Sequence, residues 1–409
     1  MEGESMSEWK EVRLGDVILH SCSGGTPKSN VSEYYDGEIP WLNTKEIDFN
    51  RIYQTERNIT QKGLDNSSAK WIDEKCVIIA MYGATAGKIA INMIPLTTNQ
   101  ACCNLKVDDR LADFRYIYYF LKKDFKFLAS LANGGAQQNL NSQIIKDYVI
   151  KLPSLSIQKE ISDLLWTIDA KIETNNKLNE KLEEMAQAIF KSWFVDFEPF
   201  KDKPFHETEL GMIPEGWEVH AASDMYNINI GKTPPRKEPI WFSENQNDVK
   251  WVSISDLGKS GAFIIDSSEK LTKEAINKYN IIVVPKNTIL LSFKLTIGRV
   301  AICNSDMTTN EAIARFYLND EFDMEYLYMY LKNYNYELLG STSSIATAVN
   351  SKIIKNMYIL KPPFEVVKRF HSIVNPLFER IRRNIEENKR LASLRDTLLP
   401  RLMSGELKV

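Results

Sequence analysis

The sequence predicts an α+β fold in which two duplicated β-rich domains are separated by two long antiparallel helices, paired as a coiled coil about a pseudo-twofold axis. Two observations support this prediction. A set of short motifs occurs twice in the same order, and each copy ends in a long helical pattern. We expect the first domain at 1–153, a central spacer helix at 154–200, the second domain at 201–361 and a C-terminal spacer helix at 362–409.

The duplication extends over the length of both domains, with spacings that differ by only a few residues. It therefore indicates an internal gene duplication. The repeated motifs are Trp9-Lys-Glu-Val12 with Trp217-Glu-Val219, Gly25-Thr-Pro-Lys28 with Lys232-Thr-Pro-Pro235, Thr97-Thr-Asn-Gln100 with Thr308-Thr-Asn-Glu311, and Leu140-Asn-Ser-Gln-Ile-Ile-Lys146 with Val349-Asn-Ser-Lys-Ile-Ile-Lys355.

Residues 81–91, MYGATAGKIAI, look like a phosphate-binding loop, but their spacing argues against one. Only three residues separate Gly83 from Gly87, and Lys88 is followed by isoleucine instead of the hydroxyl residue that holds magnesium. The second copy, Leu295-Thr-Ile-Gly298-Arg299, lacks the first glycine altogether. We interpret the segment as a strand–turn–strand unit that presents a cation, with β-type runs expected at 75–80 and 280–285.

Each copy continues with a short aromatic helix, at 114–121 and 324–331, and then a polar loop, at 134–139 and 341–347. The tyrosine stripe on the helices could stack on bases, but at this spacing it is more often core with hydroxyls at the rim. The loops could be plain connectors, or they could supply amide and hydroxyl groups to base edges.

The terminal helices are predicted from three- and four-residue spacing of apolar side chains. Residues 156–193 contain neither glycine nor proline, so one helix roughly 57 Å long is expected. Asn175 and Asn179 continue its seam, and Asn384 and Asn388 take the equivalent places in the second helix, which Pro376 is expected to start or kink. The first helix is net acidic and the C-terminal segment net basic, so the two should pair with each other.

Composition is that of an ordinary soluble protein, with 44% hydrophobic and 26% charged residues. The charged N-terminus and the absence of a long apolar run argue against a signal peptide and a membrane span. The five cysteines are scattered, which favours free thiols and a cytoplasmic location. The four histidines have no metal-ligand spacing, so we expect neither a metal nor a cofactor.

Together these motifs resemble the specificity (S) subunit of type I restriction-modification systems, which serve prokaryotic defence. The resemblance covers nearly the whole chain, although the second copy departs from the pattern at its Gly-Thr-Pro and turn motifs. The stretches that carry it include Gly24-Gly-Thr-Pro-Lys28, Ile39-Pro-Trp41, Ile79-Ala-Met-Tyr-Gly-Ala-Thr85, Thr97-Thr-Asn-Gln-Ala-Cys102, Leu152-Pro-Ser-Leu155 and Phe190-Lys-Ser-Trp-Phe-Val-Asp-Phe-Glu-Pro199.

The resemblance implies a DNA-binding protein that has no catalytic site of its own. Each domain would be a target recognition domain that reads one half of a bipartite asymmetric sequence in double-stranded DNA. The helices would set the spacing and bind two methyltransferase (M) subunits, and restriction (R) subunits would join in the full complex. The aromatic segment with Trp193, Phe194 and Phe197 could pack into its own chain or, as the resemblance implies, dock a methyltransferase subunit.

Two other classes of protein share part of this pattern. A stand-alone DNA adenine methyltransferase is suggested by Ile359-Leu-Lys-Pro-Pro-Phe364, a near-match to N-P-P-F, but Lys361 cannot accept hydrogen bonds from a target amine. A coiled-coil scaffold that does not bind DNA explains the helices but leaves two duplicated domains without a role.

Base reading needs amide, hydroxyl and cationic side chains on loops, with further cations for phosphates. Loop residues with these side chains are the candidate DNA-binding residues. In the first copy they are Thr26, Lys28, Ser29, Tyr82, Thr85, Lys88, Gln137, Gln138, Asn139 and Asn141, and in the second copy Lys232, Thr233, Arg236, Lys237, Lys294, Thr296, Arg299, Ser343, Ser344 and Asn350.

Overall fold

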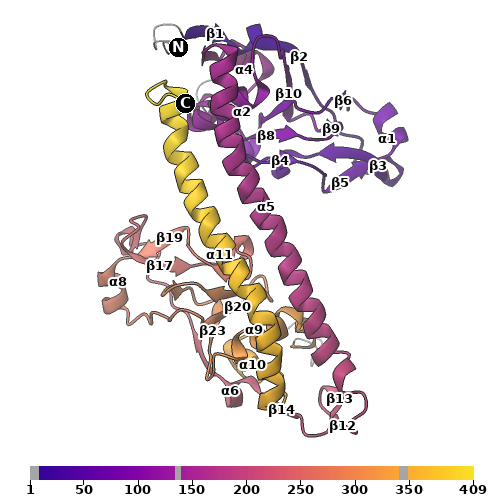
Figure 1. The fold of residues 1–409 in the computed structure, drawn as a ribbon, viewed down its shortest axis with the longest axis vertical. Coiled ribbons are helices and arrows are strands. Elements are labelled where there is room, and N and C mark those ends of the chain that lie inside the picture. Colours follow the sequence, from indigo (N-terminus) through magenta and orange to yellow (C-terminus); the bar gives the residue numbers. More distant parts are fainter. Residues whose placement is uncertain (1–8, 134–139, 340–348) are drawn as a thin grey trace. The chain divides into compact units, whose positions relative to one another are not determined.

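The structure, a computed structural model, describes residues 9–133, 140–339 and 349–409. The chain forms two compact units. Unit 1 contains residues 1–171 and 391–409, and unit 2 contains residues 172–390. Each unit combines β-sheets with parts of two long helices, α5 (Leu155–Phe194) and α11 (Phe364–Met403) (Figure 1).

Unit 1 is built around two mixed sheets. Their strand orders are β2-β10-β7-β8-β4 and β5-β3-β9-β6, and a separate pair joins β1 to β11. The strands are β1 (Lys10–Arg13), β2 (Ile18–Ser23), β3 (Tyr35–Leu42), β4 (Arg51–Ile52), β5 (Arg57–Ile59), β6 (Trp71–Ile72), β7 (Val77–Ala80), β8 (Ile89–Asn92), β9 (Leu96–Thr98), β10 (Cys102–Val107) and β11 (Val149–Leu152). The shorter helices are α1 (Gln61–Asp65), α2 (Phe114–Lys123), α3 (Phe125–Asn133) and α4 (Ser142–Asp147).

Unit 2 repeats this plan. Its sheets have the orders β15-β23-β20-β21-β18 and β16-β19-β17-β22, with the pairs β12-β13 and β14-β24 beside them. The strands are β12 (Phe205–Thr208), β13 (Gly211–Pro214), β14 (Glu218–Ala221), β15 (Asn227–Ile230), β16 (Phe242–Ser243), β17 (Val249–Val252), β18 (Phe263–Ile264), β19 (Glu269–Leu271), β20 (Ile289–Ser292), β21 (Val300–Cys303), β22 (Thr308–Thr309), β23 (Ile313–Tyr317) and β24 (Tyr358–Lys361). Its helices are α6 (Ala222–Met225), α7 (Ile254–Lys259), α8 (Lys273–Lys278), α9 (Asp323–Asn333) and α10 (Ser351–Lys355).

The parallel pairings show that the two units share one topology. Trp41 pairs with Thr97 across parallel strands β3 and β9, and Trp251 pairs with Thr308 across β17 and β22. The short strands β4 and β18 likewise run parallel to β8 and β21. The predicted duplication and α+β class are therefore confirmed.

The aromatic helices α2 and α9 belong to the cores of their units. Tyr116 and Tyr326 are buried, and their hydroxyls donate hydrogen bonds to the carbonyls of Lys151 and Leu360 at 2.8 and 2.5 Å. A buried phenol needs such a partner, and both find it on the strand that precedes the long helix. The core interpretation of the tyrosine stripes is confirmed.

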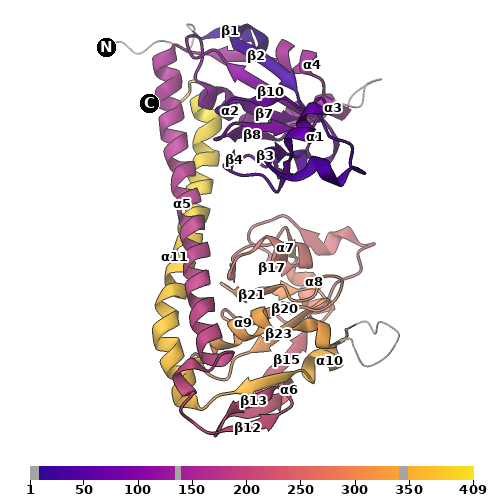
Figure 2. The same cartoon turned by 90° about the vertical axis from the view of Figure 1, so that its right-hand side faces the viewer.

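Helices α5 and α11 run antiparallel and side by side within each unit (Figures 1 and 2). In unit 1, Arg395 forms an ion pair with Asp169 at 2.7 Å. In unit 2, Asn175 Nδ2 donates to Asn388 Oδ1 at 2.9 Å, and Asn384 Nδ2 donates to Asn179 Oδ1 at 2.8 Å. The four seam asparagines therefore meet each other between the helices, as predicted.

One local expectation was wrong, and another is narrowed. The stretch 280–285 is not a strand of the hairpin. Only Val284 forms an isolated β-bridge, with Met307, and the counterpart of β7 is β20. Asn280 has a positive φ of 48°, and Pro285 has no N–H to donate to a ladder, so the run is unsuited to pairing. Of the two alternatives for Pro376, the structure excludes the start of the helix, because α11 begins at Phe364.

Candidate nucleic-acid interface

In unit 1, three segments meet at one edge of the sheet that contains β2, β10 and β7. Cys103 pairs with Ser23 on one side and with Ile79 on the other, both antiparallel. The carboxyl ends of β2 and β7 therefore lie beside the amino end of β10. The Gly-Thr-Pro loop that follows β2 and the turn that follows β7 leave the sheet at this edge.

Unit 2 has the same edge. Ala314 of β23 pairs with Ile230 of β15 and with Leu291 of β20. The loop after Ile230 contains Lys232 and Thr233, and the turn after Ser292 contains Lys294 and Thr296. Candidate residues that are far apart in the sequence are thus gathered at one edge in each unit.

The Gly-Thr-Pro loop is packed tightly against its own unit. A Cβ atom on Gly24 would lie 2.0 Å from the carbonyl oxygen of Thr98, and one on Gly25 would lie 2.2 Å from the backbone of Ser68. Trp41 Nε1 donates to the carbonyl of Gly25 at 2.9 Å, and Trp251 Nε1 donates to that of Lys232 at 3.2 Å. Glycine is needed here because the backbones approach too closely for a side chain.

Several candidate residues are engaged within their own unit. The Thr26 hydroxyl contacts Gln100 Oε1, and the Thr233 hydroxyl donates to the Glu311 carboxylate. Lys88 forms a 2.7 Å ion pair with Asp48, and Arg299 donates to the carbonyl of Ile254 at 2.8 Å.

Two cations of the second loop are also partnered. Lys232 donates to the carbonyl of Tyr279 at 2.6 Å. Arg236 pairs with Glu269 at 2.8 Å, and its guanidinium lies 4.5 Å from the ring centroid of Trp251. The turns at 81–91 and 295–299 were expected to present a cation. Their cations, Lys88 and Arg299, instead bind neighbouring segments of their own units.

Other candidates are available to a ligand. Lys28, Lys237 and Lys294 are exposed, and within the described part of the chain none of them forms an ion pair. Tyr82 is 38% exposed, and Ser29 and Thr296 are exposed as well. Thr85 is half-buried in the turn. These side chains offer hydroxyls and positive charges at the two edges.

Asn141 and Asn350 are helix caps. Asn141 Oδ1 accepts from the backbone N–H of Gln143 and Ile144 at the start of α4, and Asn350 Oδ1 does the same at the start of α10. Their amide groups remain as donors. The polar-loop candidates Gln137, Gln138, Asn139, Ser343 and Ser344 lie outside the described residues.

A buried positive charge lies directly beneath the edge of unit 2. Arg315 of β23 is 1% exposed and donates to Thr309 Oγ1 at 2.9 Å. Burial lowers the pKa of its guanidinium, and among the described residues no carboxylate forms an ion pair with it. Its equivalent in unit 1 is the neutral Asn104, which donates to Thr98. Because a buried charge is screened less than an exposed one, Arg315 adds positive potential at this edge.

The site also contains a residue that sequence reasoning missed. Leu295 lies in the turn after β20 with its side chain 98% exposed and its φ at +61°. Leu295 follows the end of β20 by three residues, as Gly83 follows the end of β7, and both have a positive φ. Aligned on Gly87 and Gly298, the repeat instead places Leu295 opposite Ala84, so the sequence alone contains no signal.

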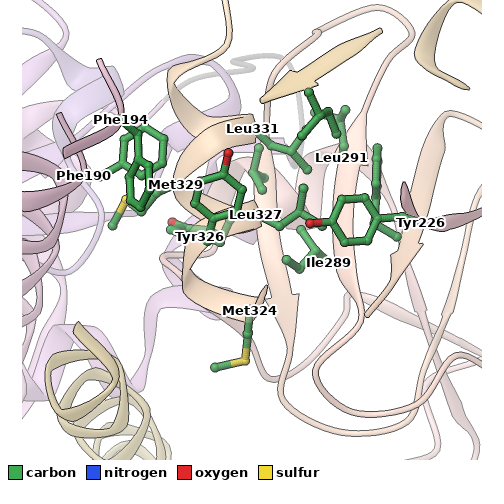
Figure 3. Close-up of a cluster of buried hydrophobic side chains, with 14 of the residues drawn as sticks. Phe190, Phe194, Tyr226, Ile289, Leu291, Met324, Tyr326, Leu327, Met329 and Leu331 are labelled. Carbon is green, nitrogen blue, oxygen red and sulfur yellow. The ribbon is translucent and has the colours of Figure 1, made fainter. Parts of the chain in front are cut away.

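The aromatic segment predicted to bind a partner packs into its own chain. Phe194 is buried in the core of unit 2, 4.8 Å from Tyr326 between ring centroids (Figure 3). Trp193 lies 6.0 Å from Phe370, and Phe197 lies 5.5 Å from Trp217. Trp193 and Phe197 are half-buried, so they keep some surface, whereas Phe194 has almost none.

The described residues contain neither a metal-binding cluster nor a membrane-spanning helix. None of their His, Cys, Asp and Glu side chains form a group of three or more that could hold a metal ion. None of their helices combines the length and apolar character of a membrane span. The five cysteines, all within these residues, are free, and four of them are buried.

The repeated topology, the two equivalent loop edges and the paired helices define a class of protein in which two copies of one recognition domain share a helical pair. The family model described as "Type I restriction modification DNA specificity domain" matches residues 6–184 and 214–392. The chain therefore belongs to this family. It is the DNA specificity subunit of a type I restriction-modification enzyme, with two target recognition domains, and catalysis lies in partner subunits.

Individual relatives agree. The chain is 32% identical to the type I restriction enzyme MjaIX specificity subunit of Methanocaldococcus jannaschii, over 100% of this chain and 95% of that protein. It is 25% identical to the HindI specificity subunit of Haemophilus influenzae, over 98% and 100%. The crystal structure of the S subunit from M. genitalium has the same fold, with a TM-score of 0.56 at 16% identity over 96% of each chain.

Proposed function

We propose that each unit reads one half of a bipartite, asymmetric sequence in double-stranded DNA through the loops at its sheet edge. The observation that carries this proposal is the shared register. In unit 1 the loop after β2 and the turn after β7 leave the sheet at the same edge, and in unit 2 the loop after β15 and the turn after β20 do so. Two copies of one surface with different side chains suit the reading of two different half-sites. The loops supply hydroxyl and cationic side chains, which are the groups that contact base edges and phosphates.

The paired helices are proposed to set the distance between the half-sites and to bind two methyltransferase subunits, with restriction subunits joining in the full complex. Support comes from the continuity of α5 and α11, each of which passes from one unit into the other. The buried contacts among Asn175, Asn179, Asn384 and Asn388 fix which turns of the helices face each other, because a polar seam residue disfavours other registers. The surfaces left on Trp193 and Phe197 are candidates for part of the methyltransferase contact.

The half-site assignment can be tested with matched changes in the two turns. Tyr82→Ser and Thr296→Ala alter exposed side chains, neither of which donates a side-chain hydrogen bond within the described chain. The complex with methyltransferase subunits would be assayed on duplexes of its own target, carrying single base-pair changes in either half. We expect Tyr82→Ser to reduce discrimination in one half only and Thr296→Ala in the other only, by roughly 5- to 100-fold per contacted base pair. If both variants affect the same half, the assignment of one unit to each half-site is wrong.

A further inference from the structure

Leu295 is presented at the tip of a braced turn. Its neighbours close a γ-turn around it, in which the N–H of Thr296 donates to the carbonyl of Lys294 at 2.7 Å. The Ser292 hydroxyl donates to the carbonyl of Thr296 at 2.6 Å and accepts from the N–H of Arg299 at 3.1 Å. The side chain that these bonds hold out is 98% exposed.

This conformation is unfavourable for leucine. A γ-turn with positive φ is rare and strained, and a branched side chain in the left-handed region adds to the strain. Counted from the end of the preceding strand, the first copy has Gly83 in this place, where the same sign of φ, +73°, costs nothing. Strained, exposed residues of this kind concentrate where a ligand is held.

The surroundings favour nucleic acid over protein as the ligand. Lys294 adjoins Leu295, and Arg315 is buried in β23, the strand that pairs with β20. Leu295 and the 37% exposed Ile297 together form too small an apolar patch for a protein interface, whose core needs a larger contiguous apolar area. It matches a duplex, in which phosphates surround base edges whose only apolar substituent is the C5 methyl group of thymine.

Resting on the proposed reading of one half-site by unit 2, we propose that Leu295 determines specificity by packing against a thymine C5 methyl group in that half-site. The equivalent turn of unit 1 has glycine at this position and cannot make the contact. The tip residue is therefore one source of the different sequence preferences of the two units.

Replacing thymine by uracil removes only this methyl group, so it gives a direct test. The complex with methyltransferase subunits would be titrated with duplexes of its own target, identified by methylation-sensitive sequencing, in which each thymidine is replaced in turn by deoxyuridine. We expect the unaltered protein to lose roughly fourfold in affinity at one thymidine of the half-site read by unit 2, the factor for about one buried methyl group. Leu295→Ser should lose a similar factor on the normal duplex and nothing further on that deoxyuridine duplex.

Controls separate this contact from folding and from the proposed function. Leu295→Gly restores the residue of the first copy and relieves the strained φ, so it should fold at least as well as the unaltered chain while losing methyl sensitivity. Leu295→Met should keep most of that sensitivity. The proposal is overturned if no deoxyuridine position is coupled to Leu295, if the half-site contains no thymine in either strand, or if Leu295 variants bind as tightly as the unaltered chain. Failure of the unaltered complex to bind any DNA would instead refute the proposed function.

Discussion

We expect leucine in place of Asn384 and of Asn175 to change the stability of unit 2 in opposite directions, although the two asparagines occupy equivalent places in the helices. Asn384 is 1% exposed and its amide donates one neutral hydrogen bond, to Asn179. Asn384→Leu loses about 1 kcal/mol for that bond and gains about 2 kcal/mol from a buried leucine, a net stabilisation of about 1 kcal/mol. Asn175 is as deeply buried but donates twice, to Asn388 Oδ1 at 2.9 Å and to the Glu387 carboxylate at 2.7 Å.

A hydrogen bond to a charged acceptor contributes about 1.5–3 kcal/mol. Asn175→Leu therefore loses more than it gains, and the free energy of unfolding falls by about 1 kcal/mol. Calorimetry of the full chain should show the transition of unit 2 move up by about 2–4 °C for Asn384→Leu and down by a similar amount for Asn175→Leu. Asn277→Leu, at an exposed position of α8, is the control for adding a leucine to a helix. If the two seam variants shift in the same direction, the distinction between neutral and charge-assisted bonds is wrong.

Two further predictions concern spacing and pH. The first change adds four residues to α5 within 172–189 and four to α11 within 381–398, which lengthens the helix pair by roughly 6 Å, about two base pairs. The gap between the two recognised half-sites should then grow by one or two base pairs, while both half-site sequences stay the same. Sequencing of methylated sites checks this, and an unchanged gap would contradict it. Burial, aided by the nearby Asp320, raises the pKa of Asp323 from 3.8 to about 6, so the folded state prefers the protonated carboxyl and loses stability as the pH rises from about 4 to 6. Asp323→Asn should therefore stabilise unit 2 by about 1–3 kcal/mol at pH 7.5 and hardly at all at pH 4, and an equal effect at both values in thermal unfolding would count against it.

Features that depend on repetition and periodicity were predictable from the sequence. The two β-rich domains, the aromatic helices in the core and the antiparallel pairing of α5 and α11 all follow from motifs that occur twice and from apolar spacing. The run 280–285 attracts a strand prediction because it is richer in β-branched residues than β20, and only the backbone at Asn280 and Pro285 excludes it.

The candidate site was less predictable, because the same residue types serve loops and ligands. Thr26 and Thr233 contact Gln100 and Glu311, partners that lie on a different strand connection and carry no local signal. Asn141 could have been recognised as a helix cap, since a short helical run follows it directly. Leu295 was passed over because polarity guided the choice of candidates, whereas its importance lies in its backbone conformation.

The division of the chain into units has a consequence for protein synthesis. Leu399, Leu402 and Met403 of α11 belong to the same buried cluster as Leu14 and other residues of the first domain. The ribosome makes them only after all of residues 172–390, so a nascent first domain lacks three members of its buried cluster until unit 2 has been translated. Chains that terminate early within α11 would lack these residues and keep part of the cluster exposed, which makes them targets for chaperones and proteases instead of competitors for DNA.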